Sequence, residues 1–222
     1  MNFNLLAHPL HFLAKLFGFT KDPTDMYDGE IPSNYKPDPK IDIIRYLLQN
    51  YFSSFYIDCH ESFYDEIKKS DEGYVSIEYF LKCAEIQEMK ATAQDLIDAA
   101  SSSLYLETDG AQIRSKIPYS PDPNRLQHSI HVSNFENDTP DFYIKQFIEF
   151  IPNFKPIKSM VMGLYKNFDG QYSFSGDVYC ELNSEENAKL AAERKLTDKD
   201  GNKYDVNLLT DYSPFLSENI EQ

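Results

Sequence analysis

Apolar residues in the first half of the chain recur at helical spacing. From Ile41 onward they lie three and four residues apart, at Ile44, Leu47, Leu48, Tyr51, Phe52 and Phe55. Further helices are predicted over Glu61–Lys69, after the N-cap residue Ser76, and over Ala93–Ser101. The alternating segment 104–114, with its Asp-Gly turn, predicts a β-hairpin. Several helices closed by a small hairpin are typical of a winged helix.

The second half of the chain alternates between strand and helix patterns. Strands are predicted at 129–135, 157–164, 172–182 and 206–209, and helices at 142–150 and 184–194. This βαββαβ order predicts an antiparallel sheet with two helices on one face and a free opposite face, which is the arrangement of an RNA recognition motif. The fold class that we expect is therefore α+β.

Proline-rich segments divide the chain. The expected parts are an N-terminal segment 1–40, a first domain 41–118, a linker 119–127, a second domain 128–215 and a tail 216–222. The N-terminal segment combines an amphipathic helix with a proline-rich connector. That helix either packs on its own domain or docks into a groove of a partner, and the sequence leaves both possibilities open.

The charge balance restricts how such a chain could hold a polyanion. The 222 residues contain 36 Asp and Glu against 21 Lys and Arg, a formal net charge of −15, and neither predicted domain is basic. Phosphate contacts by lysine and arginine normally supply most of the non-specific affinity for nucleic acid. A nucleic acid would therefore be held in one local pocket, or with help from another region or protein.

The segment from Ile41 to Val75 resembles the La motif, with which La and the La-related proteins hold the 3′ ends of RNA. The resemblance rests on the order Tyr51-Phe52, Phe55, Phe63, Asp71-Glu72-Gly73-Tyr74-Val75 and Ile113-Arg114, followed by the βαββαβ pattern. It implies a winged-helix La motif followed by an RNA recognition motif, with RNA as the ligand.

In that family, a glutamine, two tyrosines, an aspartate and two phenylalanines grip the last uridines and the free 3′ hydroxyl. The matching positions in this chain are Leu47, Asn50, Tyr51, Glu61, Phe63 and Cys83. The resemblance implies that Asn50, Tyr51, Glu61 and Phe63 remain RNA-binding candidates. Tyr51 or Phe63 would stack a base, and Glu61 would accept hydrogen bonds from ribose hydroxyls. The changes at Leu47, Asn50 and Cys83 imply weakened uridine selectivity. Alternatively, Tyr51 and Phe63 are core aromatics.

The second domain carries two further candidates. His131 and Tyr179 fall on stacking positions of the two strand signatures of the RNA recognition motif. Asp177 occupies the remaining stacking position and would repel phosphate, and Glu181 falls on the same face because strand side chains alternate. The sheet is thus expected to orient the first domain or to meet a protein, with base stacking at His131 and Tyr179 as the alternative.

Other classes of function find little support in the sequence. Its three cysteines, Cys59, Cys83 and Cys180, are widely separated and form no metal-binding or disulfide pattern. No constellation of catalytic side chains or phosphate-binding glycine loop is present. No apolar run reaches the ~18 residues of a membrane span. We expect no enzymatic activity, no cofactor, no metal site and no membrane partner.

Together with these observations, the resemblance to the La motif implies a non-catalytic La module. It would stabilise and help assemble a specific small non-coding RNA particle in the nucleus, with telomerase RNA or a similar small nuclear RNA as the ligand. Its other partners would be subunits of the same ribonucleoprotein, bound by the N-terminal helix and the acidic sheet face. One alternative is a La-type chaperone of 3′ oligouridine ends of nascent transcripts. The other is a protein interaction scaffold with little direct RNA binding.

Overall fold

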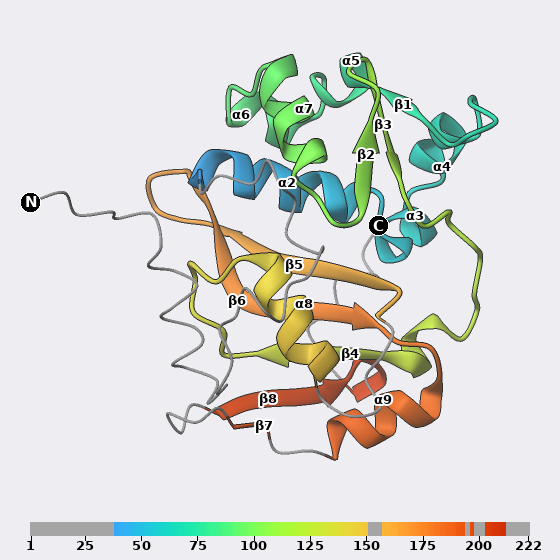
Figure 1. The fold of residues 1–222 in the computed structure, drawn as a ribbon, viewed down its shortest axis with the longest axis vertical. Helices are drawn as coiled ribbons and strands as arrows, with labels where there is room; N and C mark the ends of the chain where they lie inside the picture. The colour runs from blue at the N-terminus through green and yellow to red at the C-terminus, as the bar shows by residue number, and fades with distance from the viewer. Residues whose placement is uncertain (1–37, 151–156, 194–195, 198–202, 212–222) are drawn as a thin grey trace, which may run out of the picture.

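The computed structural model describes residues 38–150, 157–193, 196–197 and 203–211. Helices and two antiparallel sheets in these residues form an α+β fold (Figure 1), which confirms the predicted class. No helix in this part of the chain is long and apolar enough to cross a membrane. The predicted N-terminal helix and the tail 216–222 lie outside the described residues, and the domain boundaries stay a prediction.

Residues 38–116, here called the N-terminal unit, are mostly helical. Its helices are α2 (Pro39–Tyr51), α3 (Ser54–Cys59), α4 (Glu61–Ile67), α5 (Ile77–Phe80), α6 (Ala84–Glu88) and α7 (Ala93–Ser101). The strands β1 (Val75–Ser76), β2 (Leu106–Thr108) and β3 (Gln112–Ser115) pair in the order β1-β3-β2. Helix α7 has the predicted bounds because Thr92 and Asp95 form a reciprocal capping box at its start. That these elements form a winged-helix La motif remains a prediction.

The first helix is shorter than its apolar pattern predicts. Helix α2 ends at Tyr51, and α3 begins after Ser53, whose Oγ accepts a hydrogen bond from the backbone N–H of Tyr56. Phe55 therefore belongs to a separate helix, and its side chain packs against Val161 of the second sheet. The break redirects one aromatic side chain from the predicted α2 stripe to the other half of the molecule.

Residues 129–211, here called the C-terminal unit, contain the second sheet. Its elements are β4 (Ser129–Ser133), α8 (Asp141–Phe150), β5 (Ser159–Lys166), β6 (Tyr172–Glu181), α9 (Glu185–Ala192), β7 (Leu196–Thr197) and β8 (Lys203–Leu208). The strands lie in the order β5-β6-β4-β8-β7, and all neighbouring pairs are antiparallel. The βαββαβ order predicted from the sequence is present, with the short strand β7 added before the last strand.

The two faces of this sheet have different surroundings. Ile130 and Val132 of β4 are fully buried in the core, which also contains residues of α8 and α9. His131 lies between them and so points to the opposite face, where it pairs across the strands with Tyr179 of β6. Val161 of β5 pairs with Tyr179 and shares that face.

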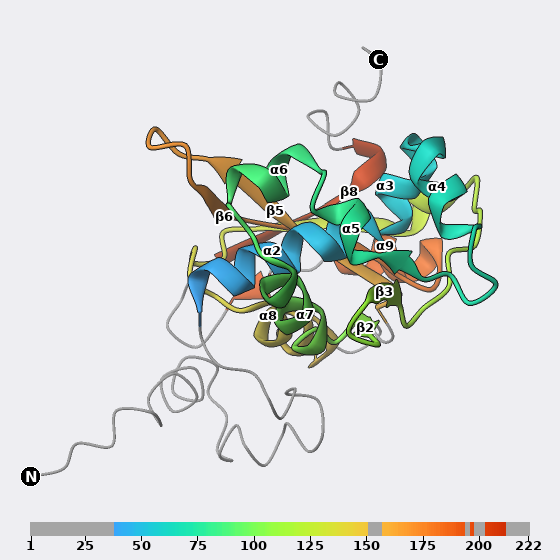
Figure 2. The ribbon, with the colours of Figure 1, turned by 90° about the horizontal axis from the view of Figure 1, so that it is seen from above.

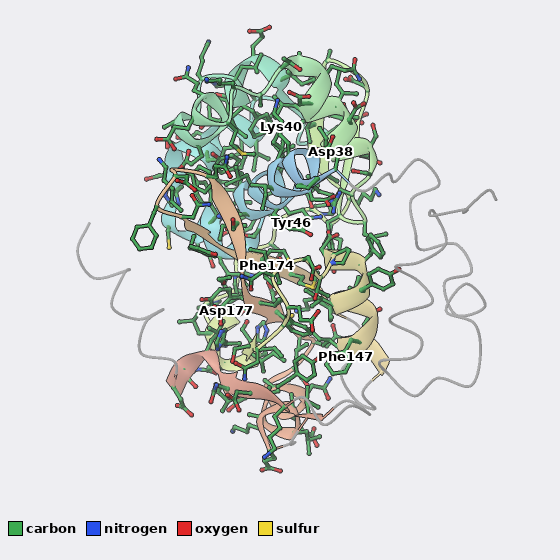
Figure 3. All side chains as sticks on the ribbon, turned by 90° about the vertical axis from the view of Figure 1, so that its left-hand side faces the viewer. Asp38, Lys40, Tyr46, Phe147, Phe174 and Asp177 are labelled. Carbon is green, nitrogen blue, oxygen red and sulfur yellow. The ribbon has the colours of Figure 1, made fainter. Side chains whose placement is uncertain are left out.

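The two units share one continuous hydrophobic core, and a buried ion pair joins them. The guanidinium of Arg45 in α2 is fully buried and lies 3.1 Å from the carboxylate of Asp141 at the start of α8. The side-chain amide of Gln49 donates to the same carboxylate at 2.8 Å. Tyr46 lies edge-on to Phe174 of β6, with ring centroids 6.3 Å apart (Figure 3). Helix α2 is thus attached to both the sheet and α8.

Helix α2 also covers the edge of the second sheet. It lies beside β5, the edge strand of that sheet (Figures 1 and 2). An uncovered edge strand can pair with another chain, and a helix laid along it blocks that pairing. Near the turn between β5 and β6, Glu88 of α6 contacts Lys166 Nζ and the hydroxyl of Tyr172, both at 2.8 Å. The N-terminal unit therefore supports the β5–β6 hairpin at two places.

Two glycines provide a matched test of the close approach between β6 and the backbone of Phe135, which follows β4. Gly176 of β6 has φ +88°, and an added Cβ would lie 2.5 Å from the carbonyl oxygen of Phe135. Gly110 has φ +91°, with nothing within 4 Å of an added Cβ. Gly110→Ala should cost about 1–2 kcal/mol of backbone strain. Gly176→Ala adds a clash with the backbone of Phe135 to this strain. The free energy of unfolding in urea should therefore fall by about 1–3 kcal/mol more in Gly176→Ala than in Gly110→Ala. Equal losses would contradict this packing.

Candidate functional site

Two predicted pocket residues meet in the N-terminal unit. The ring of Tyr51 at the end of α2 lies 6.2 Å from that of Phe63 in α4, and the two residues are only 4% and 2% exposed. The hydroxyl of Tyr51 donates to a carboxylate oxygen of Glu85 in α6 at 2.9 Å. Burial, together with nearby Cys83 and Glu85, raises the pKa of Tyr51. The rings of Tyr51 and Phe63 therefore form a buried floor rather than an open stacking surface.

Partly exposed aromatic side chains lie beside this floor. We call the whole group the aromatic cluster; it consists of Tyr51, Tyr56, His60, Phe63, Tyr79 and Phe80. The imidazole of His60 lies flat on the ring of Tyr56, with centroids 3.7 Å apart and planes within 6°. Burial, and next the neighbouring hydroxyl of Tyr79, raises the pKa of Tyr56 to about 12. The hydroxyl of Tyr56 is thus a hydrogen-bond donor at neutral pH.

The other predicted residues of the pocket lie differently. Glu61 is exposed in the first turn of α4, and Asn50 is half-buried, with its backbone carbonyl accepting a hydrogen bond from Ser53 Oγ. The carboxylate that contacts the floor is instead that of Glu85, which the sequence analysis missed. The sequence signal for Glu85 is weak, because an acidic residue in the first turn of a short helix is ordinary.

The two predicted residues of the sheet are adjacent. The rings of His131 and Tyr179 lie 5.1 Å apart on the face away from α9. His131 is only 2% exposed, and its Nε2 lies 2.9 Å from a carboxylate oxygen of Asp177. Burial lowers the pKa of His131, although the charge of Asp177 opposes the shift. Asp177, which the sequence identified as repelling phosphate, is thus bound to the imidazole beside it.

The face that holds His131 and Tyr179 is covered, whereas the strand pattern predicted a free face. Apolar side chains from three segments pack on Val161 and Tyr179. They are Phe55 of α3, Leu126 of the 3-10 turn η2 (Arg125–His128) and Leu209 of the 3-10 turn η3 (Leu209–Asp211). We call these three side chains the sheet cover. His131 is buried on this face, whereas Tyr179 remains partly exposed, so a base could not reach the imidazole without a movement of the covering side chains.

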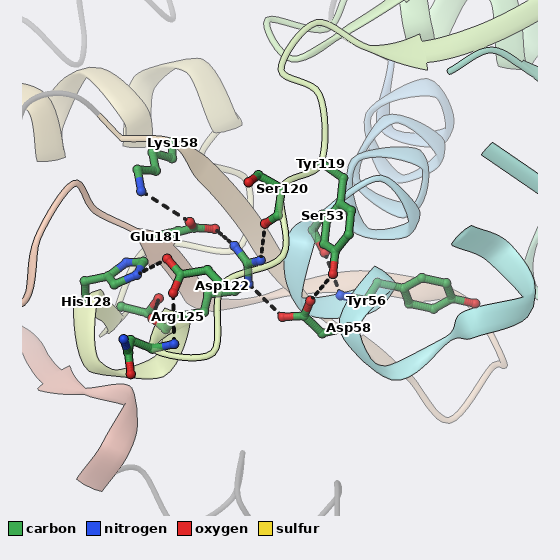
Figure 4. A network of polar contacts seen from close by, with 12 residues as sticks. Ser53, Tyr56, Asp58, Tyr119, Ser120, Asp122, Arg125, His128, Lys158 and Glu181 are labelled. Carbon is green, nitrogen blue, oxygen red and sulfur yellow. Dashed lines mark hydrogen bonds and ion pairs between the residues drawn. The ribbon is translucent and has the colours of Figure 1, made fainter. Parts of the chain in front are cut away.

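Arg125 of η2 ties the cover to both units (Figure 4). Its guanidinium binds Asp58 of α3 and Glu181 of β6, each at 2.7 Å, and donates to the backbone carbonyl of Ser120 at 2.8 Å. The hydroxyl of Tyr119 donates to the carboxylate of Asp58 at 2.6 Å. Burial and this hydrogen bond raise the pKa of Tyr119 to about 12. The predicted linker is therefore ordered. We call its network of polar contacts the clasp; it consists of Asp58, Tyr119, Ser120, Asp122, Arg125, His128, Lys158 and Glu181.

Three residues of this clasp have the composition of a metal site. Asp122, His128 and Glu181 offer ligand atoms within 4.8 Å of one another. Arg125 and Lys158 contact the carboxylate of Glu181 at 2.7 and 3.7 Å, and His128 Nε2 lies 2.8 Å from Asp122. A cation entering here would meet two positive charges at its acidic ligand. The ion pairs explain the group without a metal.

Most positive side chains of the described residues are bound to carboxylates. Besides those of Arg45, Arg125 and Lys158, the ion pairs of Lys and Arg are Lys40–Asp95, Lys68–Asp65, Lys69–Glu66, Arg114 with Glu72 and Glu107, Lys145–Glu149, Lys166–Glu88 and Lys189–Glu185. Such pairs contribute little to stability at a surface. They do reduce the positive charge that could neutralise phosphates.

Comparison with known proteins assigns no family. No protein-family model and no curated protein matches the chain. Among solved structures, one similar chain comes from a complex described as a Sxl-lethal protein/RNA complex, at 12% identity and a TM-score of 0.32. The match covers 46% of this chain and 59% of that chain, so this chain spans less than two thirds of its length. A likeness this distant carries no conclusion, and membership of the La family stays a prediction.

Replacing Arg125 tests the clasp. Arg125→Ala leaves the buried carboxylate of Glu181 without its closest partner. Loss of one member of a buried pair costs about 3–5 kcal/mol, so the free energy of unfolding in urea should fall by that amount. Lys189→Ala, which removes an exposed pair with Glu185, should change it by less than about 1 kcal/mol. If the free energy of unfolding falls as little in Arg125→Ala as in Lys189→Ala, the ion pairs of Arg125 add no more stability than an exposed pair.

The lowered pKa of His131 predicts a pH dependence. The folded protein binds fewer protons at His131 than the unfolded chain, in which a histidine has a pKa near ~6.5. Stability should therefore fall as the pH drops below about 6.5, until the folded pKa is reached. The variant His131→Phe should lose this part of the slope in urea titrations between about pH 7 and 5. Parallel slopes for the two proteins would rule out a contribution from His131.

Proposed function

We propose that this chain is the non-catalytic RNA-binding module of a La-related protein in the nucleus. It would stabilise and help assemble one small non-coding RNA particle, of which a telomerase RNA particle is an example. The observation that carries the proposal is the aromatic cluster beside Glu85. Partly exposed rings suit the stacking of bases, and a carboxylate suits hydrogen bonds from ribose hydroxyls. The resemblance to the La motif supports the same assignment.

The charges favour a small site over an extended RNA track. Many positive side chains are paired, and on the second sheet His131 is buried and Tyr179 only partly exposed. Affinity would then come from a few stacked bases, each worth about 1–3 kcal/mol. The number of phosphates contacted would be small, so the dependence of affinity on salt should be shallow. A single-stranded RNA end fits such a site better than a duplex does.

The C-terminal unit would act as a support in this function. Its helix α8 holds α2 through the pair of Arg45 with Asp141, and its strand β6 holds α3 through Arg125, which binds both Glu181 and Asp58. These contacts fix the helices that carry Tyr51 and Tyr56. A fixed arrangement of stacking groups reduces the entropy that is lost when a ligand binds.

Changes in the pocket disfavour the general La-type chaperone. Leu47 and Asn50 stand where the family has a glutamine and a tyrosine, and Cys83 stands in place of a phenylalanine. Leu47 is also buried in the core and offers no amide to a base. Strong selectivity for uridine needs such base-reading groups, so a dedicated RNA is the better proposal.

A protein interaction scaffold with little RNA binding is the second candidate function. Phe168, in the turn between β5 and β6, is fully exposed at 112%, and nearby Tyr165 is also exposed. The turn is ordered, because Asn167 Oδ1 accepts hydrogen bonds from the backbone N–H groups of Asp169 and Gln171 at 3.0 and 2.9 Å. An exposed aromatic side chain on an ordered turn is typical of an interface anchor.

Binding of short oligouridines separates the two functions. The chain should bind an oligouridine with a free 3′ hydroxyl more tightly than the same oligomer with a 3′ phosphate, as measured by fluorescence anisotropy. Tyr56→Ala should weaken that binding about tenfold, because one stacking surface is lost. Phe168→Ser is the matched control and should leave it unchanged. Equal affinity for the two ends would contradict recognition of a 3′ terminus, and no binding at low salt would favour the scaffold.

A further inference from the structure

Both the backbone and the side chain of His60 are held in one position. Its backbone, at φ −129° and ψ 78°, ends α3 and precedes α4, so the residue lies at the junction of two helices. Its ring is held by a hydrogen bond in which Nδ1–H donates to the backbone carbonyl of Tyr56 at 2.8 Å. Donation from Nδ1 leaves Nε2 at the opposite edge of the ring. The imidazole is therefore fixed in orientation before any ligand arrives.

The ring behind His60 is fixed as well. Tyr56 contacts Tyr51 and Phe63 edge-on, with centroids 5.2 and 5.8 Å apart and interplanar angles of 70° and 82°. Tyr51 and Phe63 belong to the buried core. The pair of flat rings, Tyr56 and His60, thus stands on a rigid base. One face of the imidazole is occupied by Tyr56, and the residue remains partly exposed to solvent.

We propose that the outer face of His60 binds a nucleobase of single-stranded RNA, which adds a third ring to the stack on Tyr56. This subsite rests on the proposed function, because it places one base of the RNA that the module would bind. It also extends that function, since neither His60 nor Tyr56 occupies a position that the resemblance to the La motif assigns to the pocket. Stacking tolerates any base, so this position adds affinity without reading sequence.

The chemistry of the surroundings favours a base over a protein side chain. Glu61, next to His60, is exposed, and Glu85 lies at the hydroxyl of Tyr51 in the same cluster. Carboxylates at the rim accept hydrogen bonds from ribose hydroxyls and from base amino groups. Charged residues, Glu and Asp among them, are depleted at the core of protein interfaces, so these carboxylates disfavour an aromatic anchor of a protein partner at this position.

A fluorescent base tests the subsite directly. The probe is a short oligouridine that contains one 2-aminopurine, whose emission falls when the base stacks. The full chain should bind the probe and quench it. His60→Ala should weaken binding about tenfold and remove most of the quenching, because one stacking surface is lost. His60→Phe keeps a flat ring and should bind within about threefold of the original chain. Cys59→Ala, at the neighbouring exposed position, is the matched control.

Each outcome bears on the inference. Unchanged affinity and quenching in His60→Ala, with weaker binding in Tyr56→Ala, would overturn this subsite and leave the proposed function standing. No binding of the probe by the original chain would overturn both. Failure of His60→Phe to restore binding would show that the imidazole acts through its nitrogens and not through stacking. Urea denaturation of each variant separates these results from a loss of folding.

Discussion

A buried ion pair between Arg45 and Asp141 sets the arrangement of the whole structure. Transfer of two charges from water to a core costs several kcal/mol per ion, and only close, well-bonded geometry offsets that cost. Gln49 completes the geometry by donating to the same carboxylate. Separation of the two units would remove the guanidinium of Arg45 from Asp141, while Arg45 would keep its pair with Asp42 of its own helix. The relative position of α2 and α8 is therefore specific, even though apolar packing around it could tolerate other angles.

This fixed position decides which surfaces remain available. With α2 along β5, the next helix, α3, places Phe55 on Val161, on the face of the sheet that holds His131 and Tyr179. His131 and Tyr179, which occupy the predicted stacking positions of the sheet, then lie against an internal interface, with His131 buried and Tyr179 partly exposed. The aromatic side chains at the junction of α3 and α4 remain partly exposed. The same packing that covers the predicted stacking positions of the sheet thus leaves aromatic side chains of the N-terminal unit partly exposed.

Local signals allowed the elements to be predicted, and contacts between distant segments did not follow from them. Helix α7 has the bounds that the sequence predicted, and the capping box of Thr92 and Asp95 accounts for its start. The closeness of Tyr51 and Phe63 followed from the resemblance, and their burial agrees with the alternative that they are core aromatics. The sheet cover was missed because Leu126 and Leu209 lie in single turns without a period, and because Phe55 continued the apolar spacing of α2. The RNA-binding roles of the candidate residues stay predictions.

Helix α6 is five residues long and carries two acidic contacts on different partners. Glu85 meets the hydroxyl of Tyr51, and Glu88 meets Lys166 and Tyr172 on the β5–β6 hairpin. Any displacement of this helix changes both sets of contacts at once. The aromatic cluster and the turn that carries Phe168 therefore share one mechanical support. A ligand that shifts α6 at the aromatic cluster would also change the contacts of Glu88 with the β5–β6 hairpin. By linkage, a ligand at the hairpin would change binding at the cluster by the same factor.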